Sequence, residues 1–307
     1  MTPLSVHQLP QLRREEAQLL GALAIGAATV GAIYLLVRRP GLPEVEITTL
    51  EEYRRYSRGG ALHWLLPSSV TAVRVTGHGG DVASLPRALC SLAGMRELSL
   101  SGNALAELPP ALGRLTALVS LDVSGNKLSS LPPELGALTA LTSLNAMNNE
   151  LGAVPDALGA LRALRRLGLK GNRLRALPAS VGQLTALREL FLTGNELEAL
   201  PEEIGGCTSL VKLQASHNRL AALPAALAAL PRLEFLRVAC CNITVVPSGF
   251  ANAEALAWLS LGSNPGCARS SPRRPNFPVV RIEELVVGRK LGGWLVGAVR
   301  ASCNPKP

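Results

Sequence analysis

At 307 residues the chain has room for one large or two modest domains. Hydrophobic residues make up 48% of it and aromatic residues only 3%, so the core is expected to be built from Leu, Ala and Val, as in stacked repeats. The net charge of +9 is concentrated at the C-terminus, where residues 268–307 carry eight basic and two acidic side chains. Residues 70–267 carry 16 basic and 14 acidic side chains. A nucleic-acid-binding face needs a basic stripe with aromatics, so this distribution argues against nucleic acid as the partner.

An uncharged stretch of 21 residues, 17–37, follows a charged N-terminal flank, 1–16. As a helix it would span roughly 31 Å, which is enough to cross a bilayer core. It is also rich in Ala and Gly, as helices that pack closely in membranes often are. A cleaved signal peptide, a transit peptide and an Ala-rich helix covering the end of the repeats are the alternatives. The acidic pair Glu15-Glu16 disfavours the first two, so we predict a transmembrane helix.

The charges that flank this stretch indicate its orientation. Five arginines follow it within residues 38–58, whereas only Arg13 and Arg14 precede it. The positive-inside bias therefore predicts that the rest of the chain faces the cytosol, and a soluble cytoplasmic protein is the alternative. The cysteines agree, because they are scattered and form no CxxC pair, which indicates reduced thiols. They are Cys90, Cys207, Cys240, Cys241, Cys267 and Cys303. One sequon, Asn242-Ile243-Thr244, points the other way, but a single match is expected by chance.

Residues 38–69 are predicted to be a linker and an N-terminal cap, with a short helix near residues 50–58. A repeat of 23 residues then begins. Asparagine recurs at Asn103, Asn126, Asn149, Asn172, Asn195, Asn218 and Asn264, and Cys241 fills the one remaining slot. Proline keeps the same register at Pro86, Pro109, Pro132, Pro155, Pro178, Pro201, Pro224 and Pro247.

Each constant residue has a physical reason. Leu121 and Val123 alternate with period two, as in a strand whose inner side feeds the core. The asparagine amide can satisfy buried backbone groups of adjacent repeats, and Cys241 can replace it as a small buried donor. The proline starts the return segment, where its fixed φ and missing N–H do no harm. The glycine after Leu112, Leu135 and Leu158 is expected to allow a sharp bend.

This pattern resembles the leucine-rich repeat family, with residues 70–267 as the repeat domain. The Leu-Pro-x-x-Leu-Gly-x-Leu segment is similar to that of the intracellular, Ras-associated group. The resemblance implies an α/β solenoid with a curved parallel sheet on its concave face and short helical turns on its convex face. Residues 70–85 depart from the pattern as a capping repeat does, although Val73 and Val75 fit a strand. The Pro265-Gly266 break is expected to end the solenoid.

In this frame the residues that flank the central leucine of each strand face outward, and the late strands place aromatic and basic residues there. Phe191, Phe235 and Trp258 account for three of the seven Phe and Trp residues in the chain. Aromatic and Arg side chains dominate binding hot spots. We therefore predict a protein partner on the concave face, with packing of Phe235 and Trp258 under a C-terminal cap as the alternative. The predicted contacts are Arg166, Phe191, Lys212, Phe235, Arg237 and Trp258.

The sequence offers little for catalysis, and we predict no enzymatic activity, cofactor or metal. His217 and Cys240 occupy the same position in successive repeats, about 5 Å apart, but no residue in the neighbouring repeats would orient the imidazole. A zinc site formed by these two residues with Cys207 and Cys241 fails, because Cys207 falls on the return segment and Cys241 in the buried slot.

The basic tail, residues 268–307, ends in a segment that resembles the start of a protein kinase domain. In residues 282–301 a strand leads to Gly292 and Gly297, spaced as in a Gly-rich loop over ATP, but Trp294 replaces the middle glycine. An apolar hairpin packed on the last repeat is the alternative. The leading hypothesis is a membrane-tethered adaptor or scaffold in intracellular signalling. The alternative is the regulatory half of a repeat kinase whose catalytic domain is absent or truncated. Oligomeric state is not predicted.

Overall fold

The computed structural model describes residues 71–75, 85 and 89–265, together with the strands at 35–36, 44–47, 285–290 and 293–298. All of them belong to one compact unit, Leu35–Pro307. The predicted linker helix at 50–58 and most of the predicted transmembrane helix lie outside the described residues. Within the described part of the chain, no helix is long and apolar enough to span a bilayer.

The described strands form one 13-stranded sheet in which every strand pairs with its sequence neighbours. Strands β2 to β11 run parallel, whereas β1, β12 and β13 join antiparallel. The strands are β1 (Leu35–Leu36), β2 (Glu44–Ile47), β3 (Ala72–Val75), β4 (Glu97–Ser99), β5 (Ser120–Asp122), β6 (Ser143–Asn145), β7 (Arg166–Gly168), β8 (Glu189–Phe191), β9 (Lys212–Gln214), β10 (Phe235–Arg237), β11 (Trp258–Ser260), β12 (Leu285–Lys290) and β13 (Gly293–Ala298).

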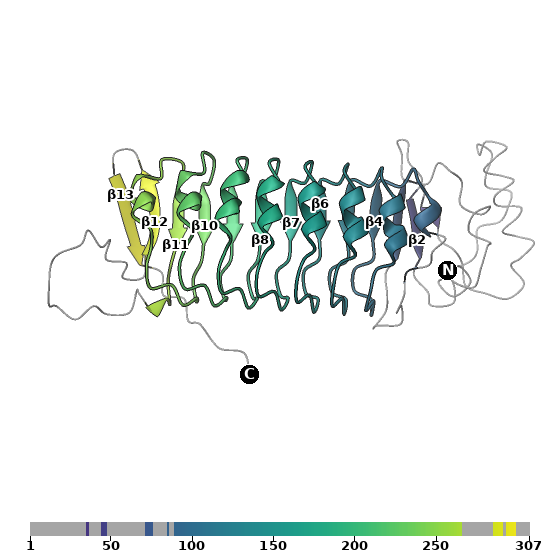
Figure 1. Ribbon diagram of the computed structural model, residues 1–307, viewed down its shortest axis with the longest axis horizontal. Coiled ribbons are helices and arrows are strands. Elements are labelled where there is room, and N and C mark those ends of the chain that lie inside the picture. Colours follow the sequence, from purple (N-terminus) through teal and green to yellow (C-terminus); the bar gives the residue numbers. More distant parts are fainter. Residues whose placement is uncertain are drawn as a thin grey trace, which may run out of the picture. The chain divides into compact units, whose positions relative to one another are not determined.

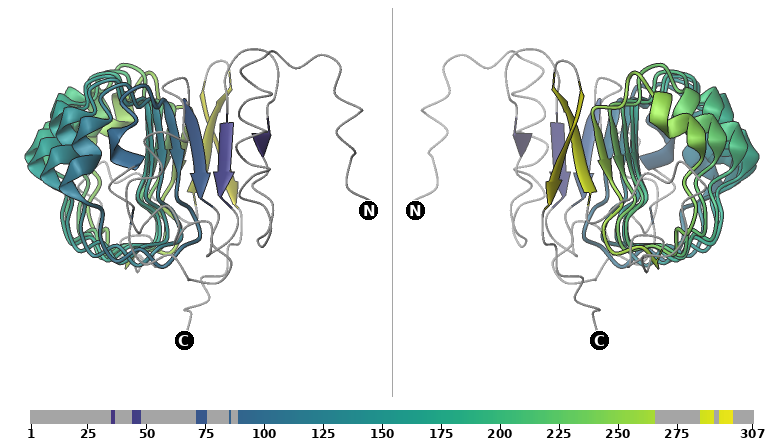
Figure 2. Two further views of the ribbon diagram at one scale, coloured as in Figure 1. Left: turned by 90° about the vertical axis from the view of Figure 1, so that its right-hand side faces the viewer. Right: turned by 90° about the vertical axis from the view of Figure 1, so that its left-hand side faces the viewer.

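Short 3-10 helices lie on the side opposite the strands, one in each repeat (Figure 1, Figure 2). They are η2 (Leu89–Ser91), η3 (Pro110–Arg114), η4 (Pro133–Ala137), η5 (Asp156–Ala160), η6 (Ala179–Gln183), η7 (Glu202–Gly206), η8 (Ala225–Ala229) and η9 (Ser248–Asn252). Between the two layers lies a core made mostly of leucine. The predicted solenoid of parallel strands and short helical turns is therefore confirmed for the described repeats, and β3 buries Val73 and Val75 as expected.

The asparagine ladder lies at the turn out of each strand, as predicted. Asn172 is typical: its Nδ2 donates to the carbonyls of Ala146 (3.0 Å) and Leu169 (2.9 Å), and its Oδ1 accepts the Leu151 N–H (3.1 Å). One side chain thus joins its own repeat to the preceding one. Cys241 replaces these bonds with weaker thiol contacts, in which its Sγ donates to the Ala215 carbonyl at 3.4 Å.

Proline immediately precedes each of η3 to η9, with φ near −65° and extended ψ, which confirms its predicted role. The expected role of the following glycines is wrong. Gly113 and Gly136 do not lie in the left-handed region; a Cβ on either would come within 2.7 Å of the backbone oxygen of Glu134 or Ala157 in the next repeat. These glycines are needed because neighbouring 3-10 helices pack closely, and not because the chain bends there.

The two ends of the sheet differ from the sequence predictions. Leu35 and Leu36, near the end of the predicted transmembrane helix, form β1 and pair antiparallel with β2, so that helix does not include them. At the other end, β12 and β13 form a hairpin, and β12 pairs with β11, the last repeat strand. This arrangement agrees with the predicted alternative of a C-terminal hairpin on the last repeat. The kinase resemblance of this segment stays a prediction.

Candidate functional site: the sheet face

The strand register places the predicted contact residues in two rows across the sheet. In the first row Arg166, Glu189, Lys212, Phe235 and Trp258 are direct neighbours on successive strands. The second row lies two residues further along each strand. It contains Gly168, Phe191, Gln214, Arg237 and Ser260. Because alternate residues of a strand share a face, both rows lie on the same side of the sheet.

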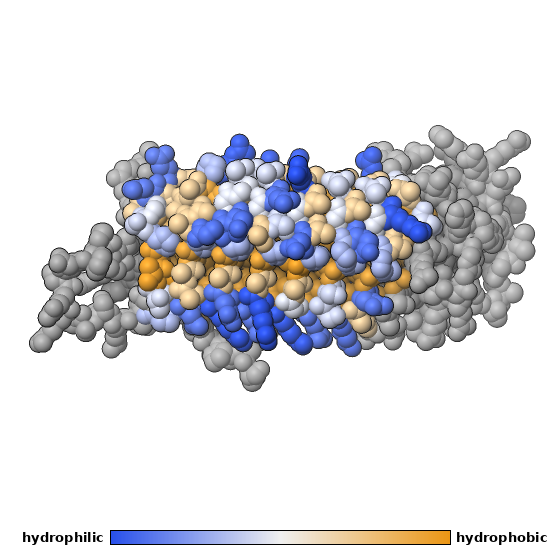
Figure 3. Space-filling view, viewed as in Figure 1, coloured by the Kyte–Doolittle hydropathy of each residue, from blue (hydrophilic) through white to orange (hydrophobic). Residues whose placement is uncertain are grey.

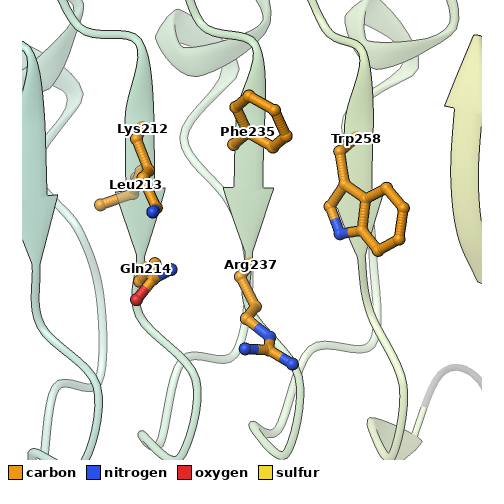
Figure 4. Close-up of a pocket in the computed structure, with 6 residues that line it drawn as sticks. All are labelled: Lys212, Leu213, Gln214, Phe235, Arg237 and Trp258. Atoms are coloured by element: carbon orange, nitrogen blue, oxygen red, sulfur yellow. The ribbon is translucent and has the colours of Figure 1, made fainter.

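Four of the six predicted contact residues line one hollow of about 230 Å³ in this face: Lys212, Phe235, Arg237 and Trp258 (Figure 4). Leu213 and Gln214 complete the lining. Gln214 was not among the predicted contacts, although the 23-residue register already placed it beside Arg237.

Phe191 does not belong to this hollow. Its side chain is only 9% exposed, and its ring lies beneath two cations, the Arg166 guanidinium at 5.3 Å and the Lys212 ammonium at 5.6 Å from the ring centroid. Cation–π attraction of this kind contributes on the order of 0.5–1 kcal/mol near a surface. The ring therefore supports the charged surface from below, and the prediction that it faces a partner directly is wrong.

Arg166 lies outside the hollow as well. Its Nε is 3.4 Å from Glu189 Oε2, and both side chains are well exposed. An exposed ion pair of this kind adds little stability. It does, however, occupy the carboxylate of Glu189, which is the register neighbour of Lys212. Among the described residues, Lys212 and Arg237 belong to no ion pair.

The two aromatic residues of the hollow are exposed: Phe235 keeps 43% of its surface accessible and Trp258 keeps 38%. The alternative prediction, in which they pack under a C-terminal cap, is therefore wrong. On the opposite face a band of apolar residues runs along the described repeats between charged residues (Figure 3). The leucines before the prolines are nearly buried, with Leu131 4% and Leu177 6% exposed. The sheet face thus differs in exposing large parts of two aromatic side chains.

The structure removes the basis for a Cys–His dyad. His217 and Cys240 do occupy equivalent positions in adjacent repeats, both with positive φ, but Cys240 is disulfide-bonded and offers no thiolate. The expectation that all six cysteines are reduced is wrong for this residue. No group of three or more His, Cys, Asp or Glu within the described ranges is arranged to hold a metal ion.

The other described cysteines are buried free thiols. Burial raises the pKa of Cys207 to about 11, and it raises the pKa of Cys90 to about 11 despite the nearby Arg114 guanidinium. Burial also raises the pKa of Cys241, although backbone hydrogen bonds from residues 217, 218 and 220 partly oppose it. Thiols of this kind are protonated at neutral pH and are poor nucleophiles.

Comparison with known families gives a match to a family described as "Leucine-rich repeat region" over residues 77–193. A comparison with curated protein sequences gives no significant match.

Several solved structures share the fold. A leucine-rich repeat protein of Leptospira interrogans aligns with a TM-score of 0.66 and 26% identity, over 72% of this chain and 55% of that chain. The ectodomain of the Arabidopsis thaliana receptor kinase GASSHO1/SCHENGEN3, in complex with CASPARIAN STRIP INTEGRITY FACTOR 2, aligns with a TM-score of 0.57 and 30% identity, over 64% of this chain and 25% of that chain.

A third structure is the octameric complex of Latrophilin 3, Unc5D and FLRT2, whose leucine-rich repeat component is FLRT2. It aligns with a TM-score of 0.57 and 26% identity, over 66% of this chain and 63% of that chain. The chain therefore spans between a quarter and two thirds of the length of these proteins. Together with the 23-residue register and the parallel sheet, the matches support the placement of this chain among leucine-rich repeat proteins.

Proposed function

We propose that this chain is a scaffold that binds a protein partner on its sheet face, at the hollow between β9 and β11. The observation that carries the proposal is the exposure of Phe235 and Trp258 on adjacent strands beside Lys212 and Arg237. A soluble surface rarely exposes large aromatic side chains side by side unless they have a partner, and aromatic and Arg side chains supply most hot-spot energy.

The solved structures support this kind of function. The Arabidopsis thaliana ectodomain was determined in complex with CASPARIAN STRIP INTEGRITY FACTOR 2, and FLRT2 was determined within an octameric complex. Their binding supports protein recognition as the role of this fold, and the identity of the partner is specific to each protein.

Site-specific crosslinking tests the proposal directly. A photo-crosslinking phenylalanine analogue at position 235 should couple the full chain to its partner, because this position is central to the hollow. Val245 is the matched control position, since it is 64% exposed and does not line the hollow. Equal crosslinking of the same protein from both positions, or none from position 235, would contradict a binding site in the hollow.

We further propose that the uncharged stretch at residues 17–37, up to β1 at its end, tethers this scaffold to a membrane, in a signalling role with the repeats in the cytosol. The uncharged stretch supports the tether and the arginines that follow it support the orientation. The disulfide of Cys240 favours the opposite orientation, with the repeats in an oxidising compartment, so the side of the membrane needs a test of its own.

Asn242 and Thr244 of the sequon are exposed and can report which side the repeats occupy. Cytosolic repeats predict an unglycosylated Asn242 and a reduced Cys240 in cells. A glycan on Asn242 together with an oxidised Cys240 would place the repeats on the opposite side. Membrane association itself is checked by alkaline carbonate extraction, which should release a variant that lacks residues 17–34 and leave the full chain in the membrane fraction.

A further inference from the structure

The hollow is electrostatically one-sided. Among the described residues, Lys212 and Arg237 are the only charged ones that line it, and neither of them belongs to an ion pair there. The carboxylate nearest to Lys212 in the register is Glu189, which is engaged with Arg166. Arg237 has the neutral residues Gln214 and Ser260 as its register neighbours. An occupant that carries negative charge would therefore find uncompensated cations.

Contacts with Phe191 bias the position of Lys212. Its ammonium stands 5.6 Å from the Phe191 ring centroid, and its side chain is half-buried. The ring attracts the cation without neutralising it, so a carboxylate that approaches Lys212 displaces no competing anion. Arg237, in contrast, is exposed and free to adopt a bidentate geometry toward a carboxylate.

The apolar part of the hollow, Phe235 and Trp258, lies beside these charges, and the strand register sets its distance from Arg237. Phe235 and Trp258 are register neighbours, about 5 Å apart across the strands. Arg237 lies two residues beyond Phe235 on the same strand and the same face, which corresponds to about 7 Å. Figure 4 shows this arrangement, with Phe235 and Trp258 on adjacent strands and Arg237 below Phe235. An extended peptide presents alternate side chains at the same spacing.

Resting on the proposed function, we infer that the hollow recognises an extended acidic segment of the partner protein, in which an acidic residue and an aromatic residue are separated by one position. The acidic side chain pairs with Arg237, and the aromatic side chain contacts Phe235 and Trp258. A second acidic residue near the aromatic one would meet Lys212.

Short fluorescent peptides and the full chain test the inference. A peptide with Glu-Ser-Phe in a neutral Gly/Ser background should bind, with fluorescence polarisation as the readout. Peptides with Lys-Ser-Phe or Glu-Ser-Ser at the centre should bind about tenfold more weakly or worse, because each loses one half of the recognition. The affinity of the Glu-Ser-Phe peptide should fall as salt is raised.

A charge swap makes the test specific to Arg237. Arg237→Glu should weaken the Glu-Ser-Phe peptide about tenfold or more and restore binding of the Lys-Ser-Phe peptide. The matched control is Arg232→Glu, an exposed arginine that does not line the hollow and should leave both affinities unchanged.

The inference is overturned if the two peptides bind the wild-type chain equally, if Arg237→Glu does not reverse their order, or if no peptide binds. If the peptides fail but position 235 still crosslinks to a partner, the proposed function stands without this inference. If neither the peptides bind nor position 235 crosslinks, the hollow is not a binding site.

Discussion

At the scale of the residue, the most informative side chains are those in the turn out of each strand. Asn172 makes three hydrogen bonds that join two repeats, and its counterpart Cys241 makes only weak thiol contacts to the Ala215 and Ala239 carbonyls. The residue directly before each ladder position has positive φ. Gly102, Gly125, Gly171 and Gly194 occupy this position in the early repeats, whereas Asn148, His217, Cys240 and Ser263 occupy it elsewhere.

Asn172→Ala should lower the free energy of unfolding by about 2–4 kcal/mol. It leaves the buried Leu151 N–H without a partner, and it removes one of the two amide bonds that the Ala146 and Leu169 carbonyls each accept. Cys241→Ala should cost only about 1 kcal/mol, since the thiol bonds it removes are weak. Urea denaturation followed by circular dichroism measures both. Equal losses in the two variants would mean that the amide bonds of the ladder do not stabilise the stack as described.

His217→Gly should stabilise the protein by about 0.5–1 kcal/mol. His217 is exposed and has φ of 55°, a conformation that costs a residue with a Cβ more than it costs glycine. Gly194→Ala is the reciprocal change at φ of 71°, where a Cβ would meet no atom closer than 3.8 Å, so any loss there reflects the backbone alone. Thermal unfolding should show a higher Tm for the first variant and a lower Tm for the second.

The buried thiol of Cys207 makes stability depend on alkaline pH. Its pKa is raised to about 11 from an ordinary value of 9.0, so the folded state disfavours the thiolate that the unfolded chain can form. The resulting stability, about 2–3 kcal/mol, is fully present below pH 9 and is lost as the pH rises toward 11. Cys207→Ala should flatten the decline of unfolding free energy between pH 9 and 11. An unchanged slope would show that the thiol ionises equally in both states.

At the scale of the element, the 3-10 helices and the strands follow different packing constraints. Strand spacing is set by backbone hydrogen bonds, whereas neighbouring 3-10 helices touch through a glycine in one repeat and a backbone carbonyl in the next. Ala228 takes the place of the glycine in its repeat, and a glycine, Gly249, lies opposite it: a Cβ on Gly249 would come within 3.2 Å of the Ala228 Cβ. At this contact the glycine therefore lies in the second of the two repeats rather than in the first.

Gly136→Ala should destabilise the protein by about 1–3 kcal/mol, since its Cβ would press against the Ala157 carbonyl oxygen at 2.7 Å. Ala228→Gly removes a methyl group from a contact where the neighbouring repeat already provides space, and should cost about 1 kcal/mol or less. Differential scanning calorimetry distinguishes the two, and a Tm for Gly136→Ala equal to that of the wild type would refute close helix packing as the reason for the glycine.

The positions of the strands and 3-10 helices were largely predictable from the sequence. The contacts between neighbouring repeats were not, because they depend on three-dimensional packing. Register and strand position follow from the spacing of Asn126 and its counterparts, because each repeat must reproduce the same turn. The role of Gly136 did not follow, because the atom that excludes a side chain there belongs to the next repeat. The burial of Phe191 also could not be predicted, since it depends on Arg166 and Lys212 from the two adjacent strands lying over the ring.

At the scale of the whole molecule, the proposed function depends on the few late repeats whose outward-facing residues differ from those of the other repeats. The repeats place one outward-facing row after another at strand spacing. Within the described repeats, only the late strands expose aromatic residues beside cations without ion pairs. The position of this cluster was predictable from the sequence, because the register fixes which residues share a face. The residues that belong to the cluster could not be predicted, because Phe235 and Trp258 are exposed whereas Phe191 is buried.

The most direct test of the hollow as a binding site is the affinity of the crosslinked partner for a Phe235→Ala, Trp258→Ala double variant. Both side chains are exposed, so the fold should be retained, and the loss of two hot-spot aromatics should raise Kd by about a hundredfold or more. Val245→Ala, which truncates an apolar side chain that is more exposed than either aromatic and lies away from the hollow, should leave Kd unchanged. A folded double variant that binds the partner as tightly as the wild type would contradict the account.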